Sequence, residues 1–443
     1  MSFNTDKPTH DDLNLLGQHR PGSVYGLFHQ VKTRGGERLL DQLFRNPLTD
    51  PKAINQRTAI FGYLQERNYS FPFDRQQCHL VEDYLGGLST GNFLFTTVNI
   101  LRKKWMGSLL KDEEFGLIVE GVRATLAFLH TCRNFIRQFD ETSARNTPPT
   151  SPLQDHLHII TTILADQRLV NLPPVPASSW QKTARCHHLF RKVLQKQLHQ
   201  LCITLYELDL YMAVSKVAKE KGFSYALALP AAENTFRASD LRHPCLENAV
   251  GNSVSLHEDS NVLFLTGANM AGKSTFMKAF GISVYLAHMG FPVAAKEMVF
   301  SIKEGLSSSI NIPDNLAMGY SHFYAEVQRV KNIAEAVSEG KDMIVIFDEL
   351  FKGTNVKDAF DATLAVTDAF AKYHNCFFLI STHITEAGET LRAKRDNIQF
   401  VYLPTLMEGS RPKYTYRLEE GISEDRHGMM IIRNERILEI ISA

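Results

Sequence analysis

The sequence predicts a two-part protein of the α + α/β class, with a helical N-terminal half followed by an α/β domain. Apolar residues recur with helical spacing over about the first 220 residues, with almost no hairpin signal. From about Pro230 onward, short β-rich runs alternate with helical patterns, which is typical of a largely parallel sheet. The 443 residues are also too many for one typical domain. We therefore expect a polar lead-in at residues 1–22, a helical domain at 23–231 and an α/β domain at 232–443.

Composition excludes several classes of protein. Apolar residues make up 44% and charged residues 22%, which is ordinary globular usage and excludes global disorder or a fibrous repeat. The 48 Lys and Arg balance the 48 Asp and Glu, and such a balance can conceal a local basic face. The six cysteines are scattered without a CxxC pair, as in a reduced cytosolic protein. With neither a signal-type N-terminus nor a membrane-length apolar run, we expect a cytoplasmic protein without membrane contact.

Helical patterns dominate the first half. The lead-in is polar, with breaks at Pro8 and Pro21-Gly22. Apolar residues then repeat at helical spacing from Val24 to Val31, and a second helical run follows an interruption at Gly35-Gly36. Pro-rich connectors lie at 146–152 and 171–176. Further helices are expected near residues 52–66, 76–87, 92–108, 112–138, 152–168 and 181–221.

A phosphate-binding loop begins the α/β pattern. The apolar run Val262–Thr266 leads into the pattern GxxxxGK[ST], and a helical pattern continues from Phe276 to His288. Backbone N–H groups of such a loop surround phosphate oxygens, Lys273 can reach the β- and γ-phosphates, and the Ser274 hydroxyl is a ligand for Mg²⁺. The sequence thus predicts ATP and Mg²⁺ as cofactors. The candidate nucleotide-binding residues are Gly267, Ala268, Asn269, Met270, Ala271, Gly272, Lys273, Ser274 and Thr275.

Two later strands end in candidate catalytic residues. Met343–Phe347 is followed by Asp348-Glu349, where Asp348 would hold Mg²⁺ and Glu349 would polarise the attacking water. Phe377–Ser381 is followed by Thr382-His383, and His383 can donate to a γ-phosphate oxygen. Alone, an acidic pair after a strand is usually a cap, and a lone histidine is usually structural. The phosphate loop favours the catalytic interpretation. Additional strands are expected at Phe400–Leu403 and Tyr414–Leu418.

Stretches throughout the second half, in matching order and spacing, resemble the ATPase domain of the MutS family of DNA mismatch-repair proteins. They are Arg242–Glu247, Thr266–Thr275, Asp314–Phe323 with Glu326, Asp348–Thr354 and Ser381–His383. The resemblance implies an ABC-like P-loop ATPase domain that works as a dimer. It also implies that Ser321 reaches the nucleotide held by the partner subunit. By the same resemblance, adenine would lie against Val250–Asn252, with Val250 and Asn252 as contacts and Tyr416 as a stacking partner.

The helical half also resembles this family. Ser23–Phe28, Thr33–Leu40 and Asn46–Arg57 are similar to the start of its core/lever domain, and Leu205–Asp209 is similar to its last lever helix. The chain begins at the core domain, so we expect a short form that lacks the mismatch-recognising N-terminal domain. Phe351-Lys352 stands where the family has Gly-Arg, and Arg426–Gly428 stands where it has S-[YF]-G. The shortened C-terminal tail predicts a weaker dimer.

One stretch of the helical half bears on DNA. No acidic residue occurs between Asp166 and Glu207, while permanent cations recur there. Such a stretch creates a local positive field that a phosphate backbone would feel, although a solvated helix face explains it equally well. The candidate DNA contacts are Lys182, Arg185, Arg191, Lys192 and Lys196.

These observations favour an ATP-dependent DNA-binding ATPase. It would couple ATP binding and hydrolysis, in a homodimer or heterodimer, to clamping of double-stranded or branched DNA in mismatch repair or recombination, with possible repair partner proteins. The alternative is a nucleotide-switched interaction protein without direct mismatch recognition. An ABC transporter subunit is disfavoured, because no LSGGQ signature or transporter Gln-loop pattern occurs.

Overall fold

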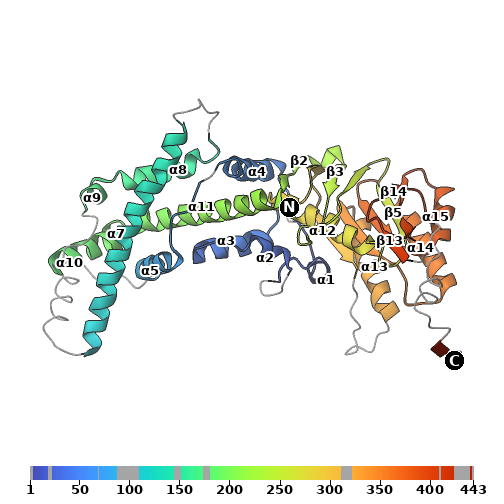
Figure 1. The fold of residues 1–443 in the computed structure, drawn as a ribbon, viewed down its shortest axis with the longest axis horizontal. Helices are drawn as coiled ribbons and strands as arrows, with labels where there is room; N and C mark the ends of the chain where they lie inside the picture. The colour runs from blue at the N-terminus through green and yellow to red at the C-terminus, as the bar shows by residue number, and fades with distance from the viewer. Residues whose placement is uncertain are drawn as a thin grey trace. The chain divides into compact units, whose positions relative to one another are not determined.

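The chain folds into two compact units. The computed structural model describes residues 3–17, 22–67, 69–86, 109–143, 151–172, 180–310, 322–408, 411–423 and 440–441. The first unit, here the α/β unit, contains Met1–Phe28, Phe44–Thr58 and Val217–Ala443. The second, here the helical unit, contains His29–Leu43 and Ala59–Lys216. Figure 1 labels the helices and some of the strands.

This division differs from the ranges expected from the sequence. Residues 1–28 and 44–58 pack with the α/β unit instead of the helical one. The cause is a buried aromatic cluster, in which the rings of Phe28 and Phe44 lie 5.3 and 5.6 Å from the ring of Phe291. Contacts between residues that are so far apart in sequence leave no trace in local periodicity.

The helical unit agrees with the expected helical pattern. Its core is rich in aromatic side chains, with Phe71, Phe73, Phe135 and Phe139 all buried and in ring contact. The helix expected at 92–108 lies outside the described residues. The elements that supply this unit, some of which continue into the other, are α3 (Arg34–Arg45), α4 (Pro51–Gln65), α5 (Arg75–Gly86), α7 (Leu109–Ser143), α8 (Gln154–Leu164), α9 (Gln167–Val170), α10 (Trp180–His188), a π-helix (Leu189–Val193) and α11 (Gln195–Lys221).

The expected interruption at Gly35-Gly36 is wrong, because both glycines lie in the first turn of α3. A Cβ atom on Gly35 would lie 2.1 Å from the ring of Tyr206, which belongs to α11. Only glycine at this position therefore lets α3 and α11 approach each other so closely. Beside them, the buried Asp209 carboxylate accepts hydrogen bonds from the backbone N–H groups of Lys32 (2.9 Å) and Thr33 (2.7 Å). Burial raises the pKa of Asp209 despite these bonds. The glycines therefore serve packing and do not end a helix.

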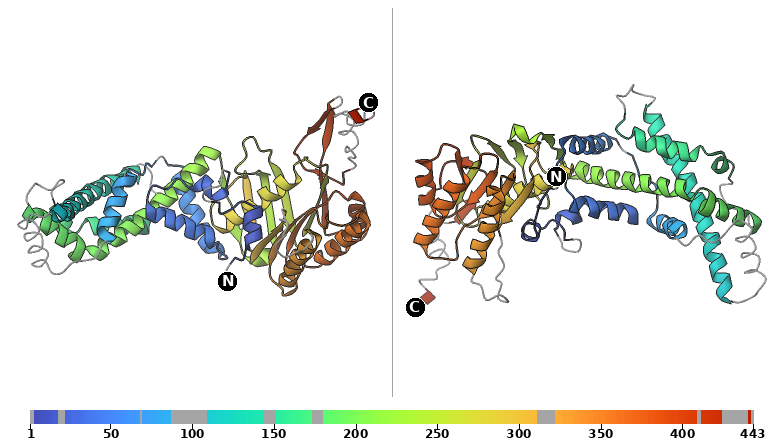
Figure 2. Two further views of the ribbon diagram at one scale, coloured as in Figure 1. Left: turned by 90° about the horizontal axis from the view of Figure 1, so that it is seen from below. Right: turned by 180° about the vertical axis from the view of Figure 1, so that it is seen from behind.

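A six-stranded sheet forms the centre of the α/β unit, in the order β14-β11-β5-β10-β9-β8. All neighbouring pairs are parallel except β11 and β14. The helices α13, α14 and α15 cover one face of the sheet, and α12 lies on the other (Figures 1 and 2). On that second face, Gly281 of α12 lies against Ile346. The elements are β5 (Val262–Gly267), α12 (Lys273–His288), β8 (Gly305–Ser309), α13 (His322–Ser338), β9 (Met343–Asp348), α14 (Val356–Phe370), β10 (Phe377–Ser381), α15 (Thr385–Arg392), β11 (Ile398–Leu403) and β14 (Glu419–Glu420).

Smaller sheets complete this unit. One has the order β2-β7-β3-β4, and β1 pairs with β6 and β12 with β13. The strand expected at Tyr414–Leu418 is wrong: β13 ends at Tyr414, and Tyr416 takes a left-handed φ of 56°. Asn252 fixes this loop, since its side chain donates to the Tyr416 carbonyl (3.0 Å) and accepts from the Leu418 N–H (2.7 Å). The bounds are β1 (Ser224–Tyr225), β2 (Leu227–Leu229), η2 (Ala231–Glu233), β3 (Thr235–Leu241), β4 (Asn252–His257), β6 (Pro292–Val293), β7 (Glu297–Ser301), β12 (Thr405–Glu408) and β13 (Arg411–Tyr414).

Residues 3–17 pack against the α/β unit and do not form the loose lead-in expected from their polarity. They include α1 (Lys7–Asp12), which contacts β8, and α2 (Val24–Phe28) follows them. The buried Asp12 carboxylate accepts hydrogen bonds from the Ser308 hydroxyl (2.7 Å) and the Ile310 N–H (2.9 Å). Asn4 forms a parallel bridge with Gly305 of β8. The segment thus covers an edge strand that would otherwise expose unpaired backbone groups.

No helix among the described residues is both long and apolar enough to span a bilayer.

The last residue of α12 makes stability depend on pH. His288 is fully buried, its Nδ1 donates to the Leu48 carbonyl (2.8 Å), and its Nε2 accepts from the Lys303 backbone N–H (3.4 Å). Burial, together with the charge of Lys303, lowers the pKa of His288 from 6.5 to about 4, although the hydrogen bond to Leu48 opposes this shift. Only the unfolded chain takes up this proton between those two pH values, so the free energy of unfolding should fall as pH decreases from 6.5 to about 4.

Urea unfolding at a series of pH values measures this effect. His288→Asn can still donate to the Leu48 carbonyl. Between pH 6.5 and about 4, it should reduce the slope of the free energy of unfolding against pH by up to about 1.4 kcal/mol per pH unit. His257→Asn, at an exposed position of the same unit, is the control. Equal slopes in the wild type and His288→Asn would contradict the prediction.

Candidate functional site

The strands β5, β9 and β10 end side by side at one edge of the central sheet. Ser381 at the end of β10 pairs with Leu265 on one side and with Asp348 on the other. The loop after β5, the acidic pair after β9 and the Thr382-His383 pair after β10 therefore meet at the carboxyl edge. Ligands bind at this edge in open α/β sheets. The register thus brings together the residues that the sequence places far apart.

The loop after β5 has the backbone conformations of a tight anion-binding turn. Gly267, Met270 and Gly272 have φ values of 141°, 72° and 104°. A Cβ atom on Gly267 would also lie 3.1 Å from the Leu403 carbonyl oxygen. Gly272 is the N-cap of α12, so the helix N-terminus faces the loop. Of the remaining loop residues, Ala271 is buried, Ala268 is half-buried, and Asn269, Met270, Ser274 and Thr275 are exposed.

Lys273 is buried inside this loop, with only 5% of its surface exposed. Its ammonium group donates to the carbonyl oxygens of Gly267 (2.8 Å) and Ala268 (3.3 Å), and it lies 3.9 Å from Glu349 Oε1. Burial lowers the pKa of Lys273, while the charges of Glu349 and Asp348 oppose this shift. The cation is thus held by backbone dipoles and by the acidic pair, at the place where phosphate charge would stabilise it further.

The acidic pair sits in a strained turn. Asp348 ends β9 and accepts a hydrogen bond from the Ser381 hydroxyl, while the Glu349 N–H donates to the Ser381 carbonyl (3.0 Å). Glu349 and Phe351 have φ values of 57° and 61°, which cost roughly 1–2 kcal/mol each in residues other than glycine. Such strain persists only where neighbours hold it, and it concentrates at functional sites. The Glu349 side chain is 25% exposed and so is open to water.

Oxygen atoms that could coordinate Mg²⁺ lie after β5 and at the end of β9, at this edge of the sheet. Ser274 supplies an exposed hydroxyl at the start of α12, and Asp348 supplies a half-buried carboxylate. Hard oxygen ligands are the donors that Mg²⁺ prefers, so these residues fit the ion. His383 is exposed at the same edge.

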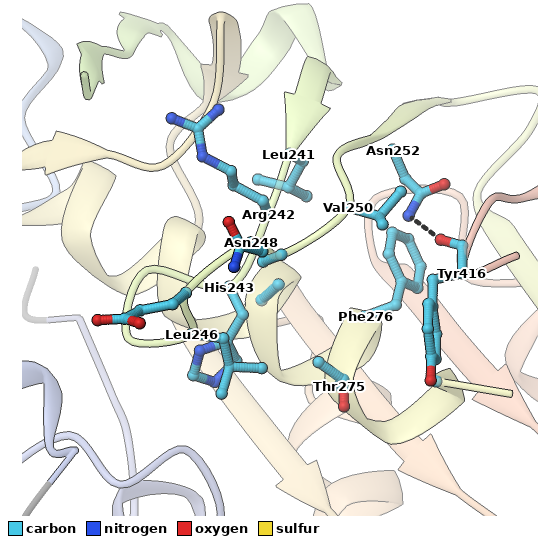
Figure 3. Close-up of a pocket in the computed structure, with 14 residues that line it drawn as sticks. Leu241, Arg242, His243, Leu246, Asn248, Val250, Asn252, Thr275, Phe276 and Tyr416 are labelled. Atoms are coloured by element: carbon cyan, nitrogen blue, oxygen red, sulfur yellow. Dashed lines mark hydrogen bonds between the residues drawn. The ribbon is translucent and has the colours of Figure 1, made fainter. Parts of the chain in front are cut away.

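A cavity of about 320 Å³ lies next to the phosphate loop. Its lining includes Val250, Asn252, Thr275, Phe276 and Tyr416, which stand around it in Figure 3. A mostly apolar cavity with a few polar groups is typical of a small-molecule site. The structure therefore brings the expected base contacts beside Gly272 and Thr275 of the loop.

Sequence reasoning missed several residues of the site. His243 lines the cavity, and burial together with the charge of Lys278 lowers its pKa to about 4. Phe276 lines the cavity from the first turn of α12, and Ser381 holds the acidic turn. The strand register could have indicated Ser381. The positions of His243 and Phe276 depend on tertiary packing.

The basic residues of the helical unit do not all reach its surface. Lys182, Arg185, Lys192 and Lys196 are exposed. Arg191 is only 4% exposed, and its guanidinium donates to the carbonyl oxygens of Tyr84 (2.7 Å) and Leu85 (2.5 Å) near the end of α5. The prediction that Arg191 contacts DNA does not agree with this position, because the side chain caps a helix. Ser321 lies outside the described residues.

The fold and the site together define a protein with a helical unit and an α/β unit. In the α/β unit, a glycine-rich loop and an acidic pair share one edge of a largely parallel sheet. Residues 263–441 match MutS domain V. The α/β unit is thus similar to domain V of the MutS family, and similarity to a MutS protein extends over 97% of the chain.

The relatives are DNA mismatch-repair proteins by name. DNA mismatch repair protein spellchecker 1 of Drosophila melanogaster is 29% identical over 203 residues, which cover 44% of this chain and 22% of the fly protein. DNA mismatch repair protein MutS of Leuconostoc mesenteroides is 23% identical over 539 residues, covering 97% of this chain and 60% of the relative. MutS of Lactococcus lactis is 27% identical over 244 residues, covering 54% and 28%. The chain thus matches less than two thirds of each relative's length.

Proposed function

We propose that this chain is a Mg²⁺-dependent ATPase of the MutS type, with an ABC-like P-loop domain. The single observation that carries this proposal is the 3.9 Å approach of the buried Lys273 ammonium to Glu349, which follow β5 and β9, the two strands on either side of β10. A buried cation in a glycine-rich loop stabilises phosphate charge, and a carboxylate beside it can take a proton from water.

Each residue of the edge then has a role. Lys273 binds the β- and γ-phosphates, and backbone N–H groups of residues 267–275 surround the phosphate oxygens. Ser274 and Asp348 hold Mg²⁺, which supplies charge neutralisation on the phosphates when bound. Glu349 orients the attacking water and accepts its proton, while His383 donates to a γ-phosphate oxygen. Measurement of Mg²⁺-dependent phosphate release from ATP by the purified chain tests this proposal, and an inert wild type would contradict it.

The base of the nucleotide is proposed to occupy the cavity beside Tyr416. This side chain is 45% exposed, and Asn252 holds its backbone through the carbonyl oxygen. Tyr416→Ala should weaken ATP binding by about 10-fold, because stacking of a base on an aromatic ring contributes about 1–3 kcal/mol. Tyr416→Phe keeps the ring and should bind like the wild type. Calorimetric titration measures both, and unchanged affinity in Tyr416→Ala would place the base elsewhere.

We further propose that the helical unit binds DNA through its exposed cations. The names of the relatives and the exposed residues Lys182, Arg185, Lys192 and Lys196 support this. Binding of homoduplex, mismatched, branched and single-stranded DNA, with and without ATP, would identify the preferred structure. Replacing these four residues by glutamine should reduce the salt dependence of binding, because each phosphate contact releases counterions.

The alternative is a nucleotide-switched interaction protein without direct mismatch recognition. The burial of Arg191 favours it, because one of the expected DNA contacts serves the fold instead. An ATPase rate that no DNA changes, together with no DNA binding, would support this alternative.

Ser321 is proposed to complete the nucleotide site of a partner subunit in a homodimer or heterodimer. Lys273→Ala and Ser321→Arg proteins, each impaired alone, should partly restore activity when mixed, since one of the two sites in a hybrid carries neither change. Hybrids that form without rescue would contradict action in trans.

A cytoplasmic location is proposed from the free cysteines, of which Cys78, Cys132, Cys186, Cys202 and Cys376 are buried.

A further inference from the structure

The helix α13 contacts the acidic turn through a buried carboxylate. Glu326 is 3% exposed, and its Oε1 accepts a hydrogen bond from the Phe351 backbone N–H at 2.5 Å. The same helix places the ring of Phe323 6.2 Å from the ring of Phe351. A Cβ atom on Gly353 would lie 3.2 Å from Phe323, so the backbone of the turn approaches the helix closely.

This hydrogen bond acts on the strained part of the turn. Glu349 and Phe351 both have left-handed backbones, with φ of 57° and 61°. On the side of β10, Ser381 accepts from the Glu349 N–H at 3.0 Å through its carbonyl. On the side of α13, Glu326 accepts from the Phe351 N–H. Two hydrogen bonds therefore fix the turn, one from the N–H of Glu349 and one from the N–H of Phe351, on either side of Leu350.

We infer that Glu326 is a positioning residue of the ATPase site, which holds the turn so that the Glu349 carboxylate faces the nucleotide. The inference rests on the proposed function. A buried N–H without an acceptor is unfavourable, so a turn that lost Glu326 would relax toward a right-handed backbone and carry Glu349 with it. A displacement of about 1 Å in a group that orients water is enough to slow the reaction strongly.

Glu326 can act in this way because α13 is itself fixed. One turn further along the helix, the Arg329 guanidinium donates to the Ser308 carbonyl oxygen (2.7 Å) and to Asp6 Oδ1 (2.9 Å). Burial favours a raised pKa for Asp6, but the hydrogen bonds and charge of Arg329 and the bonds from Thr9 outweigh it and lower the pKa. A charged pair thus anchors α13 to α1 and β8, and Glu326 extends that fixed frame to the acidic turn.

The test compares two Glu326 variants with a buried control on the same helix. Glu326→Met keeps the length of the side chain but lacks the carboxylate oxygen, whereas Glu326→Gln keeps an oxygen acceptor. Ile333→Ala removes buried apolar contact seven residues further along the same helix and leaves the Glu326 carboxylate in place. We expect Glu326→Met to lower kcat at least about 10-fold while the Kd for ATP changes less than about 2-fold. Glu326→Gln should restore kcat to within about 3-fold of the wild type.

Hydrogen exchange provides a readout that needs no ATPase activity. The Phe351 amide should exchange faster in Glu326→Met than in Ile333→Ala at equal loss of thermal stability. Equal kcat in these two variants, or unchanged exchange at Phe351, would overturn the positioning role while leaving the ATPase proposal intact. A wild type that binds and hydrolyses no ATP would overturn the proposed function, and with it this inference.

Discussion

Replacing Lys273 by alanine is expected to abolish tight MgATP binding. The ammonium group is already buried in the loop and oriented by the carbonyls of Gly267 and Ala268, so it meets the phosphates without further reorganisation. Removing one partner of a buried charge contact costs about 2–5 kcal/mol, which corresponds to a loss of roughly 30- to 5,000-fold in affinity. Calorimetric titration of the variant with MgATP measures this loss.

The control for this variant is Lys372→Ala, which removes an exposed lysine near the end of α14. It should bind MgATP like the wild type. If Lys273→Ala also kept wild-type affinity, the assignment of residues 267–275 as a phosphate loop would be untenable. A melting temperature close to that of the wild type, measured on the same samples, would show that the loss of binding does not reflect unfolding.

Glu349→Gln should retain ATP binding and lose hydrolysis by at least about 100-fold, because general-base catalysis contributes 10²–10⁴-fold. The glutamine has nearly the same shape, so the turn held by Ser381 and Glu326 should persist. Single-turnover phosphate release measures hydrolysis separately from binding. Glu339→Gln, at an exposed position in the same unit, is the matched control.

Hydrolysis near the wild-type rate in Glu349→Gln would show that another group takes the proton from water. The variant also removes a negative charge 3.9 Å from Lys273. Since Glu349 opposes the fall in the pKa of Lys273, its loss should lower that pKa further. As pH rises, Lys273 should lose its proton at a lower pH in the variant than in the wild type. The pH above which MgATP binding weakens should therefore be lower in the variant.

Local features of the proposed nucleotide site could be predicted from the sequence. The strand Phe377–Ser381 matches its expected bounds, and β5 and β9 each extend one residue past theirs. The phosphate loop could be located because its glycines, its lysine and the following helix lie within one short segment, where spacing alone determines geometry. The position of Asp348-Glu349 and His383 at one sheet edge also followed from the expectation of a parallel sheet, since the ends of such strands share one edge.

What only the tertiary structure decided depends on contacts between distant residues. Gly35-Gly36 resembles a helix break until Tyr206 is packed against it. Arg191 resembles a surface cation until its guanidinium is found on the carbonyls of α5. Residues 3–17 resemble a free polar lead-in until Asp12 is seen to bind the end of β8.

The same reason applies to the acidic turn. The sequence determined which carboxylates follow β9, because that depends on neighbours along the chain. The direction in which Glu349 faces depends on two left-handed residues, and those are stable only because Ser381 and Glu326 accept their N–H groups. Residue spacing carries no information about partners 32 and 25 positions away, so only the folded chain could decide the geometry of the acidic turn.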